Sequence, residues 1–194
     1  MTPAIASFIW AISLVAWALI RVPHQTRARK IAVVKNAKTL GDHLSLAAAA
    51  LGLSVVPLLY VVTRRPVFAD YAFHPAFGWT GLVVELLFLG IFYESHRQLG
   101  KNWSVTLEIR DDHKLVTSGL YRYIRHPMYL SFWLWSIGQL FLLPNLVAGA
   151  AGLVGVAILY FSRIHKEETL KRETFGASYY DYARLTRRII PIPW

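Results

Sequence analysis

The fold is decided by a long apolar stretch near the end of the chain, PMYLSFWLWSIGQLFLLPNLVAGAAGLVGVAILYF, residues 127–161. Its one interruption is Pro144-Asn145, a turn-forming pair. Because a membrane-spanning helix needs about 17–25 mainly apolar residues, the stretch predicts two spans, Pro127–Leu143 and Asn145–Phe161, joined as a tight helical hairpin. Each arm is close to the lower length limit, so a single re-entrant or kinked unit is the alternative.

Three further apolar stretches precede this pair. They are Ala4–Ile20, His43–Val62 and Gly78–Tyr93. The composition agrees with a membrane protein, since 55% of the 194 residues are hydrophobic and 16% are charged, against about 25% charged in soluble domains. We therefore predict an all-α integral membrane protein with five transmembrane helices.

The five spans are expected to form a single membrane domain over residues 1–194. Residues 1–96 would hold the three N-terminal spans. Residues 97–194 would hold the loop before the fourth helix, the helical hairpin and the C-terminal tail. We expect the loop and the tail to build a cytoplasmic cofactor pocket against the hairpin.

The 21 Lys and Arg residues predict how the spans are oriented. None precedes Arg21, six lie in 21–42, two in 63–77, six in 97–126 and seven after 161. Cytoplasmic loops carry the excess of positive charge, so the N-terminus is expected outside, with the C-terminus and the active site cytoplasmic. The net charge of +10 would then face anionic lipid headgroups of the bilayer. Nucleic acid is not an expected partner, because the basic residues flank apolar spans.

Several kinds of chemistry are excluded by the composition. The chain has no cysteine, which excludes disulfides, thiolate nucleophiles and cysteine-held metal sites. Glycine-rich nucleotide-binding patterns are missing, and neither the loop 97–126 nor the tail is long enough for a βαβαβ fold. His165 and Glu168 are spaced i, i+3, but no second ligand motif accompanies them, so no metal is expected.

The segment His113–Tyr129 holds the most unusual residues. Pro127 suits the first turn of a helix and favours an extended conformation at His126. The helix start, with its positive dipole end beside Arg125 and His126, predicts a site for a small carboxylate or phosphate. The alternative is that Arg125 is a membrane anchor and His126 a helix cap.

A second set of charges follows the fifth span. Arg163 and Glu167 are i and i+4, so they share one helical face. A hairpin would bring that face close to His126 and Tyr129, which predicts one pocket at the cytoplasmic end of the spans. The alternative is that Arg163 and Glu167 form only an ion pair with each other.

These residues resemble a known family in their order and spacing. The motifs are His113-x-Leu115-Val116-Thr117-Ser118-Gly119-x-Tyr121, Arg125-His126-Pro127-x-Tyr129, Arg163-x3-Glu167-Glu168, and Phe175-Gly176 with Tyr179, Tyr182, Arg188 and Pro191. They resemble the isoprenylcysteine carboxyl methyltransferases and related membrane phospholipid methyltransferases. The resemblance covers about half of the chain, from about Asn102 to the C-terminus, and leaves out the first two spans.

The resemblance implies S-adenosylmethionine-dependent methyl transfer to the carboxylate of a C-terminal prenylated cysteine or a similar lipid-like acceptor. It implies that Arg163 and Glu167 are catalytic and that Arg163 contacts the substrate carboxylate. The cofactor would be held by His113, Lys114, Leu115, Val116, Tyr121, His126, Pro127, Met128, Tyr129 and Glu167.

Two other functions remain open. The first is N-methylation of a phospholipid amine, which Arg163 disfavours because an arginine repels a protonated amine. The second is a non-catalytic membrane transport or scaffold protein.

Three features of the spans carry expectations of their own. Glu85 and Gln139 each lie about 18 Å from a cytoplasmic helix end at the helical rise, so we expect them to share a depth and a hydrogen bond, with Glu85 protonated. Gly149, Gly152 and Gly155 are expected to allow close helix packing. Tryptophans are expected mostly at the membrane interface or facing lipid. They are Trp10, Trp17, Trp79, Trp133 and Trp135.

Overall fold

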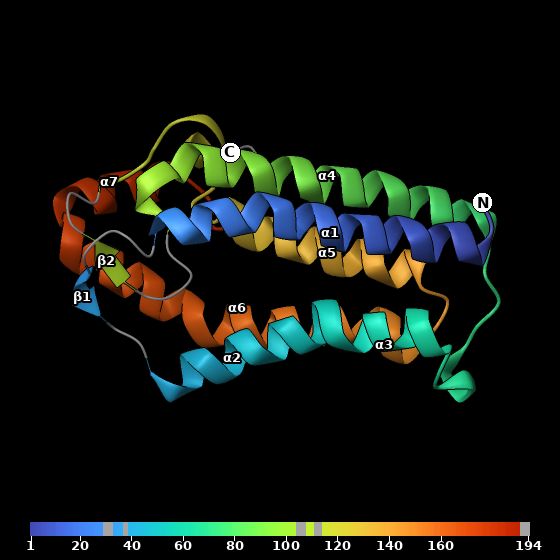
Figure 1. Ribbon diagram of the computed structural model, residues 1–194. Coiled ribbons are helices and arrows are strands. Elements are labelled where there is room, and N and C mark those ends of the chain that lie inside the picture. The colour runs from blue at the N-terminus through green and yellow to red at the C-terminus, as the bar shows by residue number, and fades with distance from the viewer. Residues whose placement is uncertain (29–32, 37–38, 104–107, 111–113, 191–194) are drawn as a thin grey trace.

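The computed structural model of the chain describes residues 1–28, 33–36, 39–103, 108–110 and 114–190. Long helices run side by side and form most of the molecule (Figure 1). The α-helices are α1 Pro3–Ala28, α2 Leu40–Ala50, α3 Val56–Thr63, α4 Pro75–Leu99, α5 Pro127–Leu142, α6 Leu146–Phe175 and α7 Ala177–Leu185. Shorter turns are the π-helix η1 Leu51–Val55 and the 3-10 turns η2 Val67–Ala69, η3 Gly100–Asn102 and η4 Gly119–Arg122.

Among the described residues, four helical rods are long and apolar enough to cross a membrane. They are Pro3–Ala28, Leu40–Thr63, Pro75–Leu99 and Leu146–Phe175. The helix α5 has 16 residues, which is short of the usual length of a span. The prediction of a helical, multi-pass integral membrane protein is therefore confirmed, whereas the fifth crossing stays a prediction.

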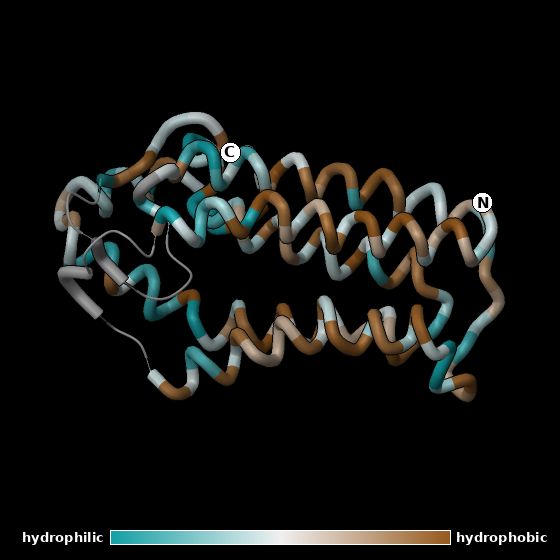
Figure 2. The backbone as a smooth tube through the Cα atoms, in the orientation of Figure 1, coloured by the Kyte–Doolittle hydropathy of each residue, from teal (hydrophilic) through white to brown (hydrophobic). Residues whose placement is uncertain are grey.

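The helices form two groups that meet along α5 and α6. In the first group α4 packs against α1 and α5, and in the second α6 packs against α2 and α3 (Figure 1). Apolar residues follow the lengths of these helices, while polar residues gather at the end that carries α7 (Figure 2). The N-terminus lies at the opposite end of the molecule.

The second rod is continuous but not uniformly α-helical. It begins with a capping box, in which the Thr39 side chain accepts from the Asp42 N–H and the Thr39 N–H donates to the Asp42 carboxylate at 2.8 Å. The π turn η1 interrupts the rod just before Pro57. Proline lacks an N–H and crowds the preceding turn, and a π turn accommodates both defects within one span.

The connection between α5 and α6 is held by Asn145. Its side-chain oxygen accepts from the Ala148 N–H at 2.9 Å and so caps α6. Its amide nitrogen donates to the Pro66 carbonyl and to the Asp70 carboxylate, each at 2.7 Å. Asn145 is fully buried, so this side chain joins the start of α6 to the segment that follows α3.

Glycine lets the second rod, Leu40–Thr63, approach α6 closely. A Cβ atom at Gly155 would lie 2.5 Å from the Ala48 carbonyl oxygen, and one at Gly52 would lie 2.2 Å from the Ala151 carbonyl oxygen. Both distances are shorter than atoms allow, so any larger side chain would push the helices apart. The packing role expected for the glycines of α6 is confirmed.

The predicted all-helical class is confirmed, with a short two-stranded sheet beside the helices. The strands β1 Val33–Asn36 and β2 Glu108–Arg110 pair antiparallel at the polar end. Two helices also continue past the predicted spans, since α1 reaches Ala28 and α6 reaches Phe175. Charged side chains one turn apart, such as Glu168 and Arg172 at 3.4 Å, support the extension of α6 beyond the apolar stretch.

The prediction that Glu85 and Gln139 share a depth and a hydrogen bond is confirmed only in part. Their depth is shared, because a Cβ at Gly138 would lie 2.8 Å from the Glu85 carboxylate. The predicted hydrogen bond is wrong: Gln139 donates to the Ala148 carbonyl at 2.7 Å and accepts from the Trp10 indole at 3.3 Å. Trp10 and Trp135 are fully buried, so their predicted place at the membrane interface is wrong as well.

Candidate active site

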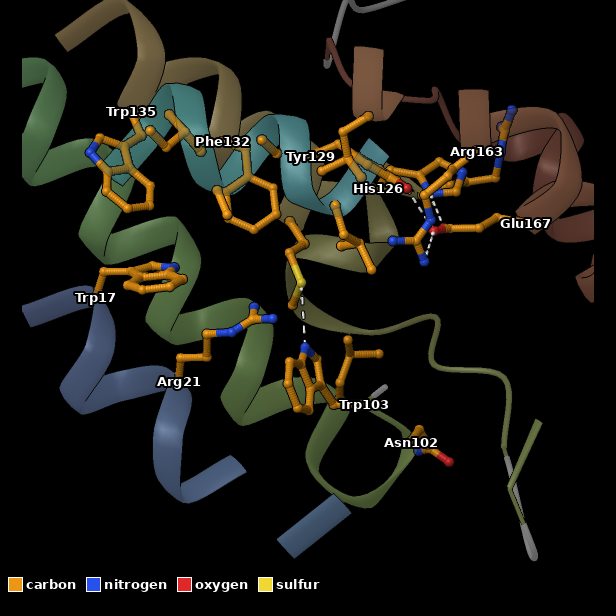
Figure 3. A pocket seen from close by; sticks show the side chains of 18 of the residues that line it. Trp17, Arg21, Asn102, Trp103, His126, Tyr129, Phe132, Trp135, Arg163 and Glu167 are labelled. Atoms are coloured by element: carbon orange, nitrogen blue, oxygen red, sulfur yellow. Dashed lines mark hydrogen bonds and ion pairs between the residues drawn. The ribbon is translucent and has the colours of Figure 1, made fainter. Parts of the chain in front are cut away.

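One cavity of about 470 Å³ lies between the two groups of helices, near the polar end, within the size range of small-molecule sites. Its two ends differ in chemistry (Figure 3). Polar side chains line the end near α7, namely Tyr121, His126, Arg163 and Glu167, and apolar side chains line the other, namely Trp17, Leu53, Phe132 and Trp135. The cavity therefore suits a ligand, or two ligands, with a charged part and a greasy part.

Glu167 is the carboxylate at the polar end. The Tyr129 hydroxyl donates to its Oε1 at 2.7 Å, and the Arg163 Nη2 lies 3.6 Å from the same oxygen. The His126 Nδ1 lies 3.6 Å from the other oxygen. The i, i+4 pair predicted on α6 therefore exists, but Tyr129 of α5 and His126, which precedes that helix, also hold this carboxylate toward the cavity.

The neighbouring Glu168 is buried and has a structural role. Its carboxylate lies 3.1 Å from the Arg125 Nε, 3.0 Å from the Arg188 Nη2 and 3.4 Å from the His126 Nε2. Arg125 also donates to the carbonyl oxygens of Ala183 and Thr186. The Arg125 side chain, which also lines the cavity, thus joins the start of α5 to α6 and to the C-terminal segment.

Backbone hydrogen bonds fix the start of α5 in the same way. The N–H of Arg125 donates to the Arg187 carbonyl at 2.7 Å, and the N–H of His126 donates to the Arg188 carbonyl at 2.9 Å. These two donors, which precede the helix, are therefore not available to a ligand. The C-terminal segment instead places the His126 ring at the cavity.

Tyr121 lines the polar end of the cavity, and two tyrosines of α7, Tyr182 and then Tyr179, pack next to it. The Tyr182 hydroxyl donates to the Tyr121 carbonyl at 2.7 Å. Burial raises the pKa of Tyr121 well above its usual value, with smaller contributions from Tyr182 and Glu167. Burial and the nearby Glu168 charge raise the pKa of Tyr179 to about 12. These hydroxyls therefore stay neutral near pH 7 and do not serve as bases.

Six of the sequence-predicted site residues line this one cavity. They are Tyr121, His126, Met128, Tyr129, Arg163 and Glu167. Pro127 begins α5 but is not part of the lining, and neither are Lys114, Leu115 and Val116. The Lys114 N–H instead donates to the Asn102 side chain at 2.9 Å, and Asn102 does line the cavity. His113 lies outside the described residues.

Sequence reasoning missed the contribution of the first two rods and of the loop near Trp103. Trp17 and Arg21 come from α1, Leu53 comes from η1, and the Trp103 indole donates to the Met128 sulfur at 3.4 Å. The motifs lie after Asn102, and an amphipathic pattern in a membrane helix does not say which polar residue faces a cavity. The spacing of Trp17 and Arg21, four residues apart, could have indicated that both side chains lie on one face of the helix.

The donor set suits an organic cation better than a metal. Across the described part of the chain, no group of three or more His, Asp or Glu side chains gathers as metal ligands would. Glu167 offers a carboxylate for an ammonium group, and aromatic rings such as Tyr129 and Trp103 can face a positively charged group. The residues present therefore fit S-adenosylmethionine, whose sulfonium and ammonium groups are both cationic.

Comparisons with known proteins agree with this chemistry. The model of the isoprenylcysteine carboxyl methyltransferase (ICMT) family matches residues 79–172. Protein-S-isoprenylcysteine O-methyltransferase B of Arabidopsis thaliana is 35% identical over 94 residues, which cover 47% of this chain and 48% of that protein. The Dictyostelium discoideum protein-S-isoprenylcysteine O-methyltransferase is 39% identical over 95 residues, which cover 47% of this chain and 40% of that protein. Each match spans less than half the length of the relative.

The fold agrees as well. A solved structure of the eukaryotic intramembrane Ras methyltransferase ICMT superposes with a TM-score of 0.58 at 23% identity, covering 99% of this chain and 68% of that one. The family model, the curated relatives and the fold together confirm the resemblance of this chain to the isoprenylcysteine carboxyl methyltransferase family.

Proposed function

We propose that this chain is a membrane-embedded, S-adenosylmethionine-dependent methyltransferase that methylates the carboxylate of a C-terminal prenylated cysteine or a similar lipid-like acceptor. One observation carries the proposal. Tyr121, His126 and Glu167, which the family resemblance assigns to the cofactor, line the same cavity as Arg163, and that cavity continues into an apolar end. A charged head and a greasy tail would both find a matching environment there.

The cofactor is assigned to the polar end. S-adenosylmethionine, when bound, supplies a methyl group activated by its sulfonium. Glu167, oriented by the Tyr129 hydroxyl, would hold the cofactor ammonium, while Tyr121, His126 and Met128 would pack around the rest of the molecule. Pro127, at the start of α5, and His113, Lys114, Leu115 and Val116 stay in the proposed cofactor set on the family resemblance alone.

The acceptor carboxylate is assigned to Arg163. A guanidinium can hold a carboxylate through two parallel hydrogen bonds, and an ordinary carboxyl titrates near pH 4, so it is ionised near pH 7. Methyl transfer would form a bond from the acceptor oxygen to the methyl carbon and break the carbon–sulfur bond, whose electron pair would stay on sulfur. No proton moves, so the chain needs no general base. Its residues align the two reactants and exclude water from them.

The membrane topology is part of the proposal. α5 is about 24 Å long at the helical rise, and three residues, 143–145, connect it to α6. We place it as the fifth crossing, paired with α6 as a helical hairpin. The distribution of basic residues supports an outside N-terminus, with the cofactor pocket and the C-terminus cytoplasmic. Because Trp17 and Leu53 line the cavity, residues 1–194 are proposed to act as a single domain.

The test is a methyl-transfer assay with two acceptors. The purified chain in detergent is incubated with S-adenosylmethionine labelled on its methyl group and either N-acetyl-S-farnesylcysteine or phosphatidylethanolamine. We expect a base-labile methyl ester on the farnesylated cysteine only. Transfer to the amine alone would support the phospholipid methyltransferase instead, and transfer to neither would contradict the proposal.

A further inference from the structure

Arg21 is a cation inside the candidate active site with no role so far. It comes from α1, whereas Arg163 comes from α6, and both line the cavity (Figure 3). Its guanidinium carbon lies 5.4 Å from the ring centroid of Trp17 and 5.5 Å from that of Trp103. Two indole rings therefore hold the guanidinium by cation–π contacts, which restricts where it can point.

In the described part of the chain, other cations around the cavity have carboxylates near them, and Lys171, which also lines the cavity, faces the charges of Glu167 and Glu168. Arg125 and Arg188 contact Glu168, and Lys166 contacts Asp42 at 3.2 Å. Among the same described residues, none of the ion pairs involves Arg21, and the charged group that acts on it most is Arg163, another cation. A cation in a partly apolar cavity is costly without an anion beside it. The surroundings of Arg21 therefore favour an anionic ligand.

The position of Arg21 indicates which part of a ligand it meets. It is attached to α1 one turn beyond Trp17, whose ring marks the apolar end, and its guanidinium lies against the rings of Trp17 and Trp103 (Figure 3). A lipid-like acceptor whose tail lies against Trp17, Phe132 and Trp135 would present its head at this boundary. An anionic head placed there would lie between the charges of Arg21 and Arg163.

We propose that Arg21 is a second binding residue for the acceptor carboxylate, and that Arg21 and Arg163 together select an anionic head over an amine. This inference rests on the proposed function and adds to it a residue from the first rod, outside the matched family region. A protonated amine would meet two cations at the same place, so the pair provides discrimination as well as affinity.

The test compares Arg21→Gln with Arg27→Gln, an exposed position on the same helix. Charge-assisted hydrogen bonds contribute about twice as much as neutral ones, so we expect Arg21→Gln to raise KM for N-acetyl-S-farnesylcysteine roughly 10- to 100-fold. The Kd for S-adenosylhomocysteine should change less than about threefold, which also shows that the variant is folded. Arg27→Gln should match the parent chain in both measurements.

A binding measurement separates recognition of the charge from a packing role. The Kd values of the farnesylated cysteine acid and of its neutral methyl ester are compared, which requires no turnover. The parent chain should prefer the acid, Arg21→Lys should keep most of that preference, and Arg21→Gln should lose it. An acid-to-ester preference that Arg21→Gln leaves unchanged, or a loss confined to cofactor binding, would overturn the inference. A parent chain that transfers no methyl group but still shows an Arg21-dependent acid preference would contradict the proposed function alone.

Discussion

Replacing Glu167 with glutamine removes the negative charge from the polar end of the cavity and preserves the size of the side chain. The Glu167 side chain is 20% exposed, and its Oε1 accepts from the Tyr129 hydroxyl at 2.7 Å. A glutamine carbonyl can still accept that hydrogen bond, so the local geometry should survive. The lost interaction is the one proposed with the cofactor ammonium.

The magnitude follows from the kind of interaction that is removed. A hydrogen bond to a charged group contributes about 1.5–3 kcal/mol, and 1.36 kcal/mol corresponds to a factor of ten. We therefore expect Glu167→Gln to weaken the binding of S-adenosylhomocysteine roughly 10- to 100-fold, since this product keeps the ammonium group. The acceptor KM should not rise, because removal of a carboxylate 3.6 Å from Arg163 favours an incoming carboxylate.

Isothermal titration calorimetry of the detergent-purified variant measures the first quantity. Glu173→Gln, at an exposed position of the same helix, serves as the matched control and should bind like the parent chain. A Kd for Glu167→Gln within threefold of the parent value would refute the assignment of Glu167 to the cofactor. A rise in acceptor KM without a change in cofactor Kd would assign Glu167 to the acceptor instead.

Three further changes probe the neighbouring groups. Arg163→Ala should leave the Kd for S-adenosylhomocysteine within about threefold of the parent value and reduce turnover at least 100-fold in the methyl-transfer assay. The reason is that the variant loses the charged group proposed to bind the reacting carboxylate. The opposite pattern would show that the roles of Arg163 and Glu167 are exchanged. Glu168→Gln should lower the free energy of unfolding by about 3–5 kcal/mol, since it leaves the buried Arg125 without its carboxylate, and a loss below about 1 kcal/mol in denaturant unfolding would contradict the joining role. Tyr179→Phe should reduce the loss of stability at high pH. The pKa of Tyr179 is raised to about 12 in the folded chain, above the ordinary value near 10. The stabilisation that its neutral hydroxyl contributes is therefore complete below about pH 10 and is lost as pH rises toward about 12. Equal slopes of melting temperature against pH for the variant and the parent chain would contradict the burial of this hydroxyl.

Local sequence patterns predicted where the helices lie better than which residues the helices contact. The run 127–161 contains two apolar stretches and a turn pair, and the structure places α5 and α6 there with Asn145 between them. Pro127 indicated the start of α5, and it is the first residue of that helix. These features depend on residues close together in sequence, which is why they could be predicted.

The same local patterns could not predict contacts between residues far apart in the sequence. Arg125 pairs with Glu168, 43 positions later, and nothing near Arg125 distinguishes that contact from a lipid-headgroup anchor. Trp17 and Trp135 carry the composition of interfacial tryptophans, yet their rings pack together with centroids 5.3 Å apart beside the cavity. Which face of a membrane helix meets protein depends on the neighbouring helices, since lipid and a protein core are both apolar.

The pairing of β1 with β2 also escaped prediction. Strands of 4 and 3 residues are too short to show the alternation of apolar and polar residues from which a strand is predicted.

In the proposed enzyme, Tyr121, His126 and Glu167 surround one cofactor in a single chamber. Calorimetric titration of the detergent-purified parent chain with S-adenosylhomocysteine, with NADPH as the control ligand, tests this claim most directly. Saturable heat with a stoichiometry near one and none with NADPH is the predicted result. No saturable heat with S-adenosylhomocysteine, or binding of NADPH in its place, would contradict it.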